Sequence, residues 1–207
     1  MRSILIFSYA FSGWAIFLLL FLYWLGFLTN FAVPKSVDSG VVLPWEIAIL
    51  INILLVLLFG LQHSLMARPW FKKWLTKSVP EPLERSTYVH FSNLALALLF
   101  VLWQPIPIVI WDTQNLLLRG VLYGICLLGG FTVVLTSFLI NHFDLFGLRQ
   151  AWLYLRGKPY KNLRFTKPGP YKWVRHPLYV GWLLTMWATP NMTVGHLFFA
   201  AAFTSYI

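Results

Sequence analysis

The chain has 207 residues, of which 59% are hydrophobic and 11% are charged, and its formal net charge is +10. A soluble domain carries about 25% charged and about 45–50% apolar residues, so this composition excludes an ordinary soluble protein and indicates an integral membrane protein. A basic excess can mark a nucleic-acid-binding protein, but the distribution of these charges along the chain, described below, argues against such a partner.

Four long apolar runs follow one another, at residues 4–28, 45–66, 89–110 and 116–140. At ~1.5 Å per residue each run is long enough to cross a hydrocarbon core of about 30 Å. The first run is too long for a signal-peptide core of about 7–15 residues and lacks an A-x-A-like cleavage site, so we expect a retained span. The single cysteine, Cys126, lies in the fourth run, so neither a disulfide nor a thiol pair for zinc is expected.

Basic residues gather in two stretches of the chain, residues 67–88 and 141–176. They are Arg68, Lys72, Lys73, Lys77, Arg85, Arg149, Arg156, Lys158, Lys161, Arg164, Lys167, Lys172 and Arg175. The two intervening connections hold only Lys35 and Arg119. Because positive residues mark the cytoplasmic side of a membrane protein, this alternation predicts a cytoplasmic N-terminus in a bacterial inner membrane. The same charges suit contacts with anionic lipid head groups.

The end of the chain is shorter than a span. After Pro190 an apolar run extends from Thr193 to Ile207, which as a helix measures about 22 Å against a core of about 30 Å. No polar flank follows Ile207, and a terminal carboxylate at membrane depth is costly. We therefore expect one domain over residues 1–207, truncated at its C-terminus. The expected fold class is all-α, a polytopic membrane protein with four long spans plus a C-terminal helical hairpin.

Four of the five histidines fall at one level of this topology, the cytoplasmic interface. They are His63, His90, His142 and His176, whereas His196 falls on the opposite side. Interfacial histidines are commonly amphipathic residues without a further role, and ligation of haem or a metal is the alternative. No pair has the spacing of H-E-x-x-H, and no cysteine or carboxylate cluster accompanies them, so we predict no metal site.

The segment GPYKWVRHPLYVG, residues 169–181, precedes an apolar stretch and contains the start of a helix. Pro177 is favoured at the first position of a helix, and the unpaired N–H groups of that first turn suit a carboxylate or phosphate from the cytosol. Aromatic faces attract a cation such as a sulfonium, and four lie in this segment or directly after it: Tyr171, Trp173, Tyr179 and Trp182. S-adenosylmethionine has both a carboxylate and a sulfonium. The alternative is that aromatic and basic residues simply line the membrane interface.

This segment resembles the RHPxYxG motif of the isoprenylcysteine carboxyl methyltransferase superfamily of membrane enzymes. The chain is most similar to the bacterial branch of that superfamily, which contains methanethiol S-methyltransferases and NnrU-like proteins. The similarity extends from about residue 30 to residue 207 through VPKSVDSG, FGLQHSLMARPWFKKW, ERSTYV, INHFDLFGLRQAWLYLRGKPY and WATPNMTVGHLFFA.

The resemblance implies a multi-helix enzyme that binds S-adenosylmethionine at its cytoplasmic side. The implied cofactor-binding residues are Leu163, Arg164, Phe165, Thr166, Tyr171, His176, Pro177, Leu178 and Tyr179. Two departures from the superfamily are visible. Eukaryotic members have a histidine where Leu163 stands, and the superfamily continues beyond the position of Ile207 into an arginine and a Glu-Glu pair that complete its sites.

The implied reaction is transfer of a methyl group to a small thiol, converting methanethiol to dimethyl sulfide without a metal. The attacking sulfur must be a thiolate, so a base or a cation is needed beside it. His142 and His63 are the candidate bases, and Arg149 is a candidate for stabilising the thiolate unless it contacts a lipid phosphate. No obligate protein partner is predicted. The alternatives are a haem- or metal-binding NnrU-like protein linked to denitrification, a methyltransferase with another lipophilic acceptor, and a non-catalytic scaffold.

Overall fold

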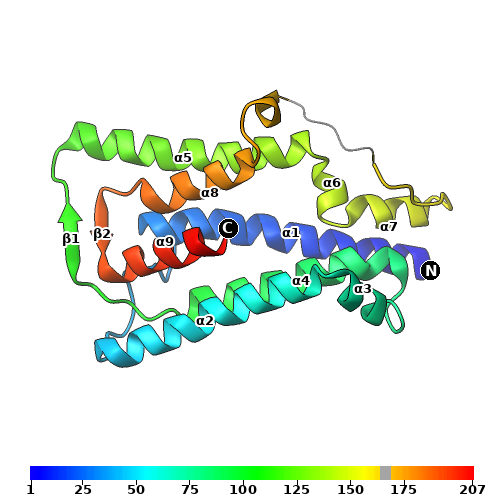
Figure 1. Ribbon diagram of the computed structural model, residues 1–207, viewed down its shortest axis with the longest axis horizontal. Helices are drawn as coiled ribbons and strands as arrows, with labels where there is room; N and C mark the ends of the chain where they lie inside the picture. The colour runs from blue at the N-terminus through cyan, green and yellow to red at the C-terminus, as the bar shows by residue number, and fades with distance from the viewer. Residues whose placement is uncertain (164–168) are drawn as a thin grey trace.

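The computed structural model describes residues 1–163 and 169–207, and its architecture is helical (Figure 1). Within that part of the chain four helices are long and apolar enough to cross a membrane: α1 (Arg2–Thr29), α2 (Trp45–Met66), α4 (Glu84–Leu102) with the turn η1 (Glu81–Leu83) before it, and α5 (Leu116–Leu139). The shorter elements are α3 (Pro69–Leu75), α6 (His142–Leu145), α7 (Leu148–Leu155), η2 (Gly169–Lys172), α8 (Pro177–Trp187) and α9 (Val194–Tyr206), with strands β1 (Val109–Asp112) and β2 (Asn191–Thr193). The expected integral membrane architecture is confirmed.

The third span differs from the predicted run 89–110, since α4 begins at Glu84 and ends at Leu102. Pro105 and Pro107 follow, and a proline removes a backbone donor and disfavours the helical conformation of the residue before it. The extended backbone at Gln104 is held instead by Asn52 of α2, whose side chain donates to its carbonyl at 2.8 Å and accepts from its N–H at 2.9 Å. Residues 109–112 then form β1, which pairs antiparallel with β2.

Helices α8 and α9 form the expected C-terminal hairpin. With 11 and 13 residues they extend only about 16 and 20 Å, so neither crosses a ~30 Å core by itself. Both lie against the long helices, and the chain ends in the middle of the bundle (Figure 1). Helix α8 is fixed by backbone contact with α5: a Cβ added to Gly181 would lie 2.8 Å from the carbonyl oxygen of Gly129, and the reverse distance is also 2.8 Å.

The core of the bundle is aromatic. Trp24 of α1 packs against Trp182 of α8, with ring centroids 4.9 Å apart, and against Phe199 and Phe203 of α9. Its indole nitrogen donates to the hydroxyl of Thr185 at 3.1 Å, so this buried N–H is satisfied. These contacts tie the central helix α1 to the short hairpin.

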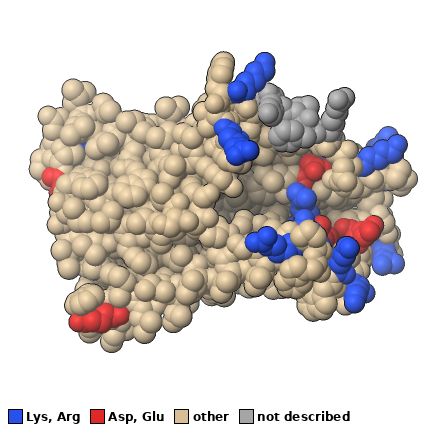
Figure 2. Space-filling view, viewed as in Figure 1, with Lys and Arg blue, Asp and Glu red and all other residues tan. Residues whose placement is uncertain are grey.

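Basic side chains gather at the end of the molecule that carries α3, α6 and α7, here called the basic end. In Figure 2 few charged side chains are visible at the opposite end, and the face shown is hollowed beside the basic cluster. The exposed side chains along the long helices are mostly apolar, as the surrounding hydrocarbon requires.

Candidate functional site

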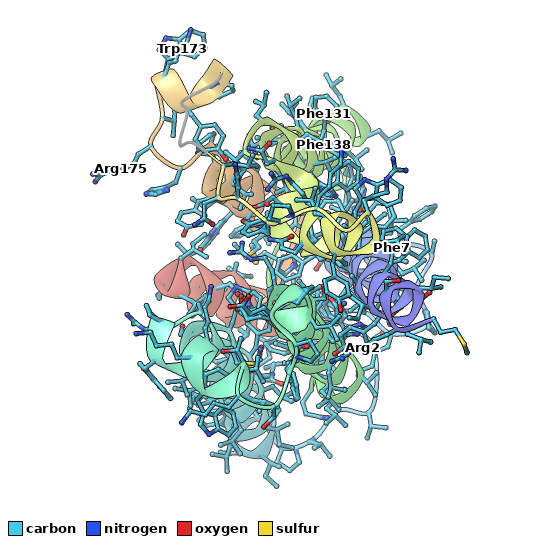
Figure 3. The ribbon with its side chains drawn as sticks, turned by 90° about the vertical axis from the view of Figure 1, so that its right-hand side faces the viewer. Arg2, Phe7, Phe131, Phe138, Trp173 and Arg175 are labelled. Atoms are coloured by element: carbon cyan, nitrogen blue, oxygen red, sulfur yellow. The ribbon has the colours of Figure 1, made fainter. Side chains whose placement is uncertain are left out.

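The RHPLY segment contains the start of α8, which lies near the middle of the bundle with the first turn directed toward the basic end (Figure 1). His176 precedes the helix as its N-cap residue, with φ −134° and ψ 68°, and Pro177 takes the first helical position, as its fixed φ favours. The imidazole of His176 stacks on the ring of Tyr179 with centroids 4.9 Å apart. Trp173 and Arg175 instead project away from the bundle (Figure 3), and 85% of Trp173 is exposed.

A cavity of about 950 Å³, here called the outer cavity, opens at this end, and charged and polar side chains are part of its lining. It is lined by Arg85, Ile140, Asn141, Asp144, Tyr160, Asn162, Leu163, Tyr171, Lys172, Trp173, Val174, Arg175 and His176. The phenol of Tyr171 reaches α5, where its hydroxyl donates to the carbonyl of Thr136 at 3.5 Å, and its burial raises its pKa. The volume falls within the roughly 300–1,000 Å³ usual for small-molecule sites.

A second cavity of about 610 Å³, here called the inner cavity, lies deeper between α1, α2, α4, α5, α8 and α9. Its walls are largely aromatic and aliphatic, including Phe17, Phe21, Trp24 and Trp182, with a few polar groups. Ile140, Tyr171 and His176 line both cavities, so these three residues mark the boundary between the outer cavity and the more apolar inner one.

Asp144 organises one wall of the outer cavity. Its carboxylate accepts from Arg149 at 2.9 Å and from the hydroxyl of Tyr160 at 3.3 Å. Arg149 also donates to the carbonyl of Lys161 at 3.1 Å and lies over the Tyr160 ring, 5.2 Å from its centroid. Burial and the charge of Asp144 raise the pKa of Tyr160. Arg149 therefore holds the segment 160–161 against α6, and the outer cavity is bounded by Asp144 and Tyr160.

His142 lies in the inner cavity wall, 3% exposed, with both ring nitrogens occupied. The indole of Trp14 donates to Nε2 at 2.8 Å, and an indole nitrogen cannot accept, so Nε2 carries the lone pair. Nδ1 lies 2.8 Å from the hydroxyl of Ser137, which itself donates to the carbonyl of Val134 at 2.7 Å. Nδ1 therefore carries the hydrogen, and burial lowers the pKa of His142, which favours the neutral ring.

His63 lines the same inner cavity, on α2, and contacts Tyr88 and Ser92 of α4. Three of the four histidines predicted at one level, His63, His142 and His176, thus line one cavity. His90 does not, because its Nε2 lies 2.9 Å from the carbonyl of Tyr9 and its ring packs against α1. Among the described residues no group of three or more His, Cys, Asp or Glu side chains is placed to hold a metal.

Most of the described residues implied by the superfamily motif line one or both cavities, whereas Pro177 lines neither and is buried at the start of α8. Leu163 lines the outer cavity, Leu178 and Tyr179 line the inner one, and Tyr171 and His176 line both. Arg164, Phe165 and Thr166 lie outside the described residues.

Sequence reasoning overlooked Arg85, Tyr88 and Asp144. Arg85 and Tyr88 are three positions apart in the segment ERSTYV, a spacing that places both side chains on one face of a helix. This spacing is the sequence signal that could have identified them as neighbours.

Comparison with protein-family models gives no match, and no solved structure matches the chain. Curated proteins do match. The chain is 52% identical over 191 residues to methanethiol S-methyltransferase of Crocosphaera subtropica, covering 92% of this chain and 75% of that protein. It is 44% identical over 207 residues to methanethiol S-methyltransferase of Mycobacterium tuberculosis, covering 100% and 85%. Against methanethiol S-methyltransferase 2 of Bradyrhizobium diazoefficiens it is 49% identical over 199 residues, covering 96% and 76%. With such identity over nearly its whole length, the chain belongs to the methanethiol S-methyltransferase family.

Proposed function

We propose that this membrane protein transfers the methyl group of S-adenosylmethionine to methanethiol, forming dimethyl sulfide. The observation that carries the proposal is the junction of two unlike chambers at Tyr171 and His176. A charged, water-soluble methyl donor suits the outer cavity, whose lining includes charged and polar side chains, and a small apolar thiol suits the inner one. The two reactants therefore meet at one boundary, and holding them there supplies the orientation that a bimolecular displacement needs.

The outer cavity has the side chains that S-adenosylmethionine requires. Arg85 offers a cation for the carboxylate, and Asp144 with Asn162 offers hydrogen-bonding partners for the amino and ribose groups. The rings of Tyr171 and His176 offer faces for the sulfonium. Bound there, S-adenosylmethionine supplies an electrophilic methyl carbon.

The motif residues have distinct proposed tasks around that group. Leu163 and Leu178 supply apolar contact on either side of the boundary, and Pro177 fixes the start of α8. Tyr179 supports the imidazole of His176 by stacking. Arg164, Phe165 and Thr166 complete the proposed set from the superfamily resemblance.

The inner cavity offers the thiol a largely apolar surrounding. Its aromatic walls give a low-dielectric surrounding, in which the attraction between a thiolate and a cationic methyl donor is stronger than in water. The candidate bases His63 and His142 both lie in its wall. Arg149 acts at a distance, through its ion pair with Asp144.

The basic end faces the cytoplasm in this proposal, because positive residues are retained on that side and the donor is cytosolic. The outer cavity then opens to the cytosol and the inner cavity lies within the bilayer. The N-terminus, at the basic end in Figure 1, is cytoplasmic as well.

The test uses the full-length protein purified in detergent. Calorimetry is expected to show S-adenosylmethionine binding, and headspace gas chromatography is expected to show dimethyl sulfide formed from methanethiol. His176→Gln removes a ring at the boundary and is expected to weaken both. His90→Gln is the matched control, since His90 lines neither cavity.

Absence of both binding and product in the unaltered protein would overturn the proposal. A preference for long-chain or prenylated thiols over methanethiol would favour the other-acceptor alternative. A visible absorption band in the purified protein would favour the haem or metal alternative.

A further inference from the structure

A hydrogen-bonded chain of three side chains lies in the wall of the inner cavity. The hydroxyl of Tyr88 lies 2.7 Å from Nε2 of His63, and Nδ1 of His63 lies 3.1 Å from the hydroxyl of Ser92. Tyr88 and Ser92 are one turn apart on α4, and His63 faces them from α2. All three residues line the inner cavity.

The direction of each hydrogen bond is fixed by the remaining partners. Ser92 donates its hydroxyl hydrogen to the carbonyl of Tyr88 at 3.0 Å and accepts from the side-chain amide of Gln62 at 3.4 Å. Its hydroxyl therefore accepts from His63, so Nδ1 carries the hydrogen and Nε2 carries the lone pair. Nε2 then accepts from Tyr88. The lone pairs of the Tyr88 oxygen are left for a group inside the cavity.

We propose that Tyr88 accepts the proton of the bound thiol while passing its own proton to His63. This inference rests on the proposed function, which requires a thiolate. The S–H bond breaks and its electron pair stays on sulfur. An O–H bond forms on Tyr88 as its former O–H bond breaks, and an N–H bond forms on Nε2. The products are a thiolate, a neutral Tyr88 and an imidazolium at His63, whose Nδ1–H still donates to the hydroxyl of Ser92.

His142 lacks such a route, although it lines the same cavity. Its Nε2 lone pair is occupied by the indole of Trp14, and its Nδ1–H is committed to Ser137. A proton can reach His142 only if one of these bonds is broken. Tyr88 is therefore the residue that contacts the thiol in this proposal, and His63 is the base that takes up the proton through Tyr88.

The surroundings of His63 keep its ring in place. Phe59 stacks on the imidazole, with centroids 5.3 Å apart and planes at 17°. The ring of Tyr206 in α9 has its centroid 6.4 Å from that of His63. The Tyr206 hydroxyl is hydrogen-bonded to the hydroxyl of Ser64 at 3.0 Å. Arg85 stands one turn before Tyr88 on α4. Among the described residues, the titratable groups in contact with the His63 ring are thus the phenols of Tyr88 from α4 and Tyr206 from α9.

The first readout does not depend on turnover. Nitrogen-15 spectra of histidine-labelled full-length protein are expected to show His63 as the Nδ1–H tautomer, assigned by its disappearance in His63→Gln. Tyr88→Phe is expected to shift the Nε2 resonance because that nitrogen loses its donor. Detection of His63 as the Nε2–H tautomer would overturn the proposal.

The second readout compares acceptors of different acidity. With methanethiol, Tyr88→Phe is expected to lower kcat/KM by about 10²-fold or more, the range of general-base catalysis. Methaneselenol ionises at far lower pH than a thiol and needs less help from a base. With this acceptor, kcat/KM of the same variant is expected to approach that of the unaltered protein. Tyr23→Phe is the matched control, because its hydroxyl also makes a 2.8 Å hydrogen bond, to Lys35, away from both cavities.

The outcomes separate this proposal from the proposed function. If the unaltered protein makes dimethyl sulfide and Tyr88→Phe makes it equally well, the proton route is wrong and the methyltransferase assignment stands. If Tyr88→Phe loses thiol and selenol turnover alike while S-adenosylmethionine binding is unchanged, Tyr88 is structural and the route is also wrong. If the unaltered protein makes no product with either acceptor, both proposals fail.

Discussion

The indole nitrogen of Trp14 donates to Nε2 of His142 across 2.8 Å, which joins the central helix α1 to the turn that follows α5. This bond lies beside the inner cavity, and His142 is almost fully buried. The same imidazole lies parallel to Phe138, with centroids 4.2 Å apart and planes at 3°. His142 therefore connects two long helices at the level where the two cavities meet.

Trp14→Phe is expected to destabilise the protein, because it leaves a buried Nε2 without its donor. The cost of such an unsatisfied group is about 1–3 kcal/mol. In Trp14→Phe with His142→Phe both partners become apolar, and Ser137 keeps its bond to Val134. The double variant is therefore expected to recover part of that stability. Thermal unfolding in detergent checks the order, and a double variant no more stable than Trp14→Phe alone would contradict it.

The stability of the protein is expected to fall on acidification because of His142. Burial lowers its pKa below the ordinary 6.5, so below that pH the unfolded chain binds a proton that the folded chain does not. The stability that His142 contributes is therefore present above the pKa of its ring in the unfolded chain. It is lost as the pH falls through the lower pKa of the ring in the folded protein. Unfolding temperatures measured across this range should drop less steeply in His142→Phe, and an unchanged slope would count against the buried neutral ring.

Much of the architecture could be predicted from composition and spacing. The features that could not be predicted have physical causes. The prediction of a single span over residues 89–110 was wrong, because hydrophobicity does not distinguish a helix from the non-helical segment after Leu102. Pro105 and Pro107 are the residues that mark this difference in the sequence. The common level of His63 and His142 was readable from topology. Their lateral position was not, because it depends on how the helices pack around α1.

The candidate site shows the same limit. The segments that carry it were visible as RHPLY and ERSTYV, since each has a helix start or a helical spacing. The pairing of Tyr88 with His63 joins residues 25 positions apart on different helices. No local pattern encodes that pairing, and the roles of Arg149 and Asp144 likewise emerge from a fold that returns segment 160–161 to α6.

Binding of S-adenosylmethionine is expected to depend on the ring of Tyr171 more than on its hydroxyl. The hydroxyl makes one long bond of 3.5 Å, to Thr136, whereas the ring lies at the boundary of both cavities. Loss of one cation–π contact of about 0.5–2 kcal/mol corresponds to roughly 2- to 30-fold weaker binding in Tyr171→Ala. Tyr171→Phe is expected to bind almost normally. Calorimetry of S-adenosylmethionine binding checks this. Tyr154→Phe is the control, because Tyr154 lines neither cavity. Equal losses of affinity in Tyr171→Phe and Tyr171→Ala would assign the effect to the hydroxyl.

The position of the RHPLY segment is expected to depend on the contact between Gly129 and Gly181. A Cβ at Gly181 would lie 2.8 Å from the carbonyl oxygen of Gly129 and 2.9 Å from the backbone nitrogen of Val133. Both are backbone atoms that cannot rotate away, so Gly181→Ala must push α8 from α5. Overpacking of this kind costs about 1–3 kcal/mol, and it displaces His176 from the cavity boundary, so binding of S-adenosylmethionine should weaken together with thermal stability.

Gly124→Ala on the neighbouring helix α5 is the matched control, since nothing lies within 4 Å of the added Cβ. Alanine is the better helix former by roughly 0.5–1 kcal/mol, so this variant should be neutral or slightly stabilised. The comparison separates crowding from helix propensity, because both changes add one methyl group to a helical glycine. If Gly181→Ala matched Gly124→Ala in unfolding temperature and in S-adenosylmethionine affinity, α8 would not be held by backbone contact with α5, and the cavity boundary would need another support.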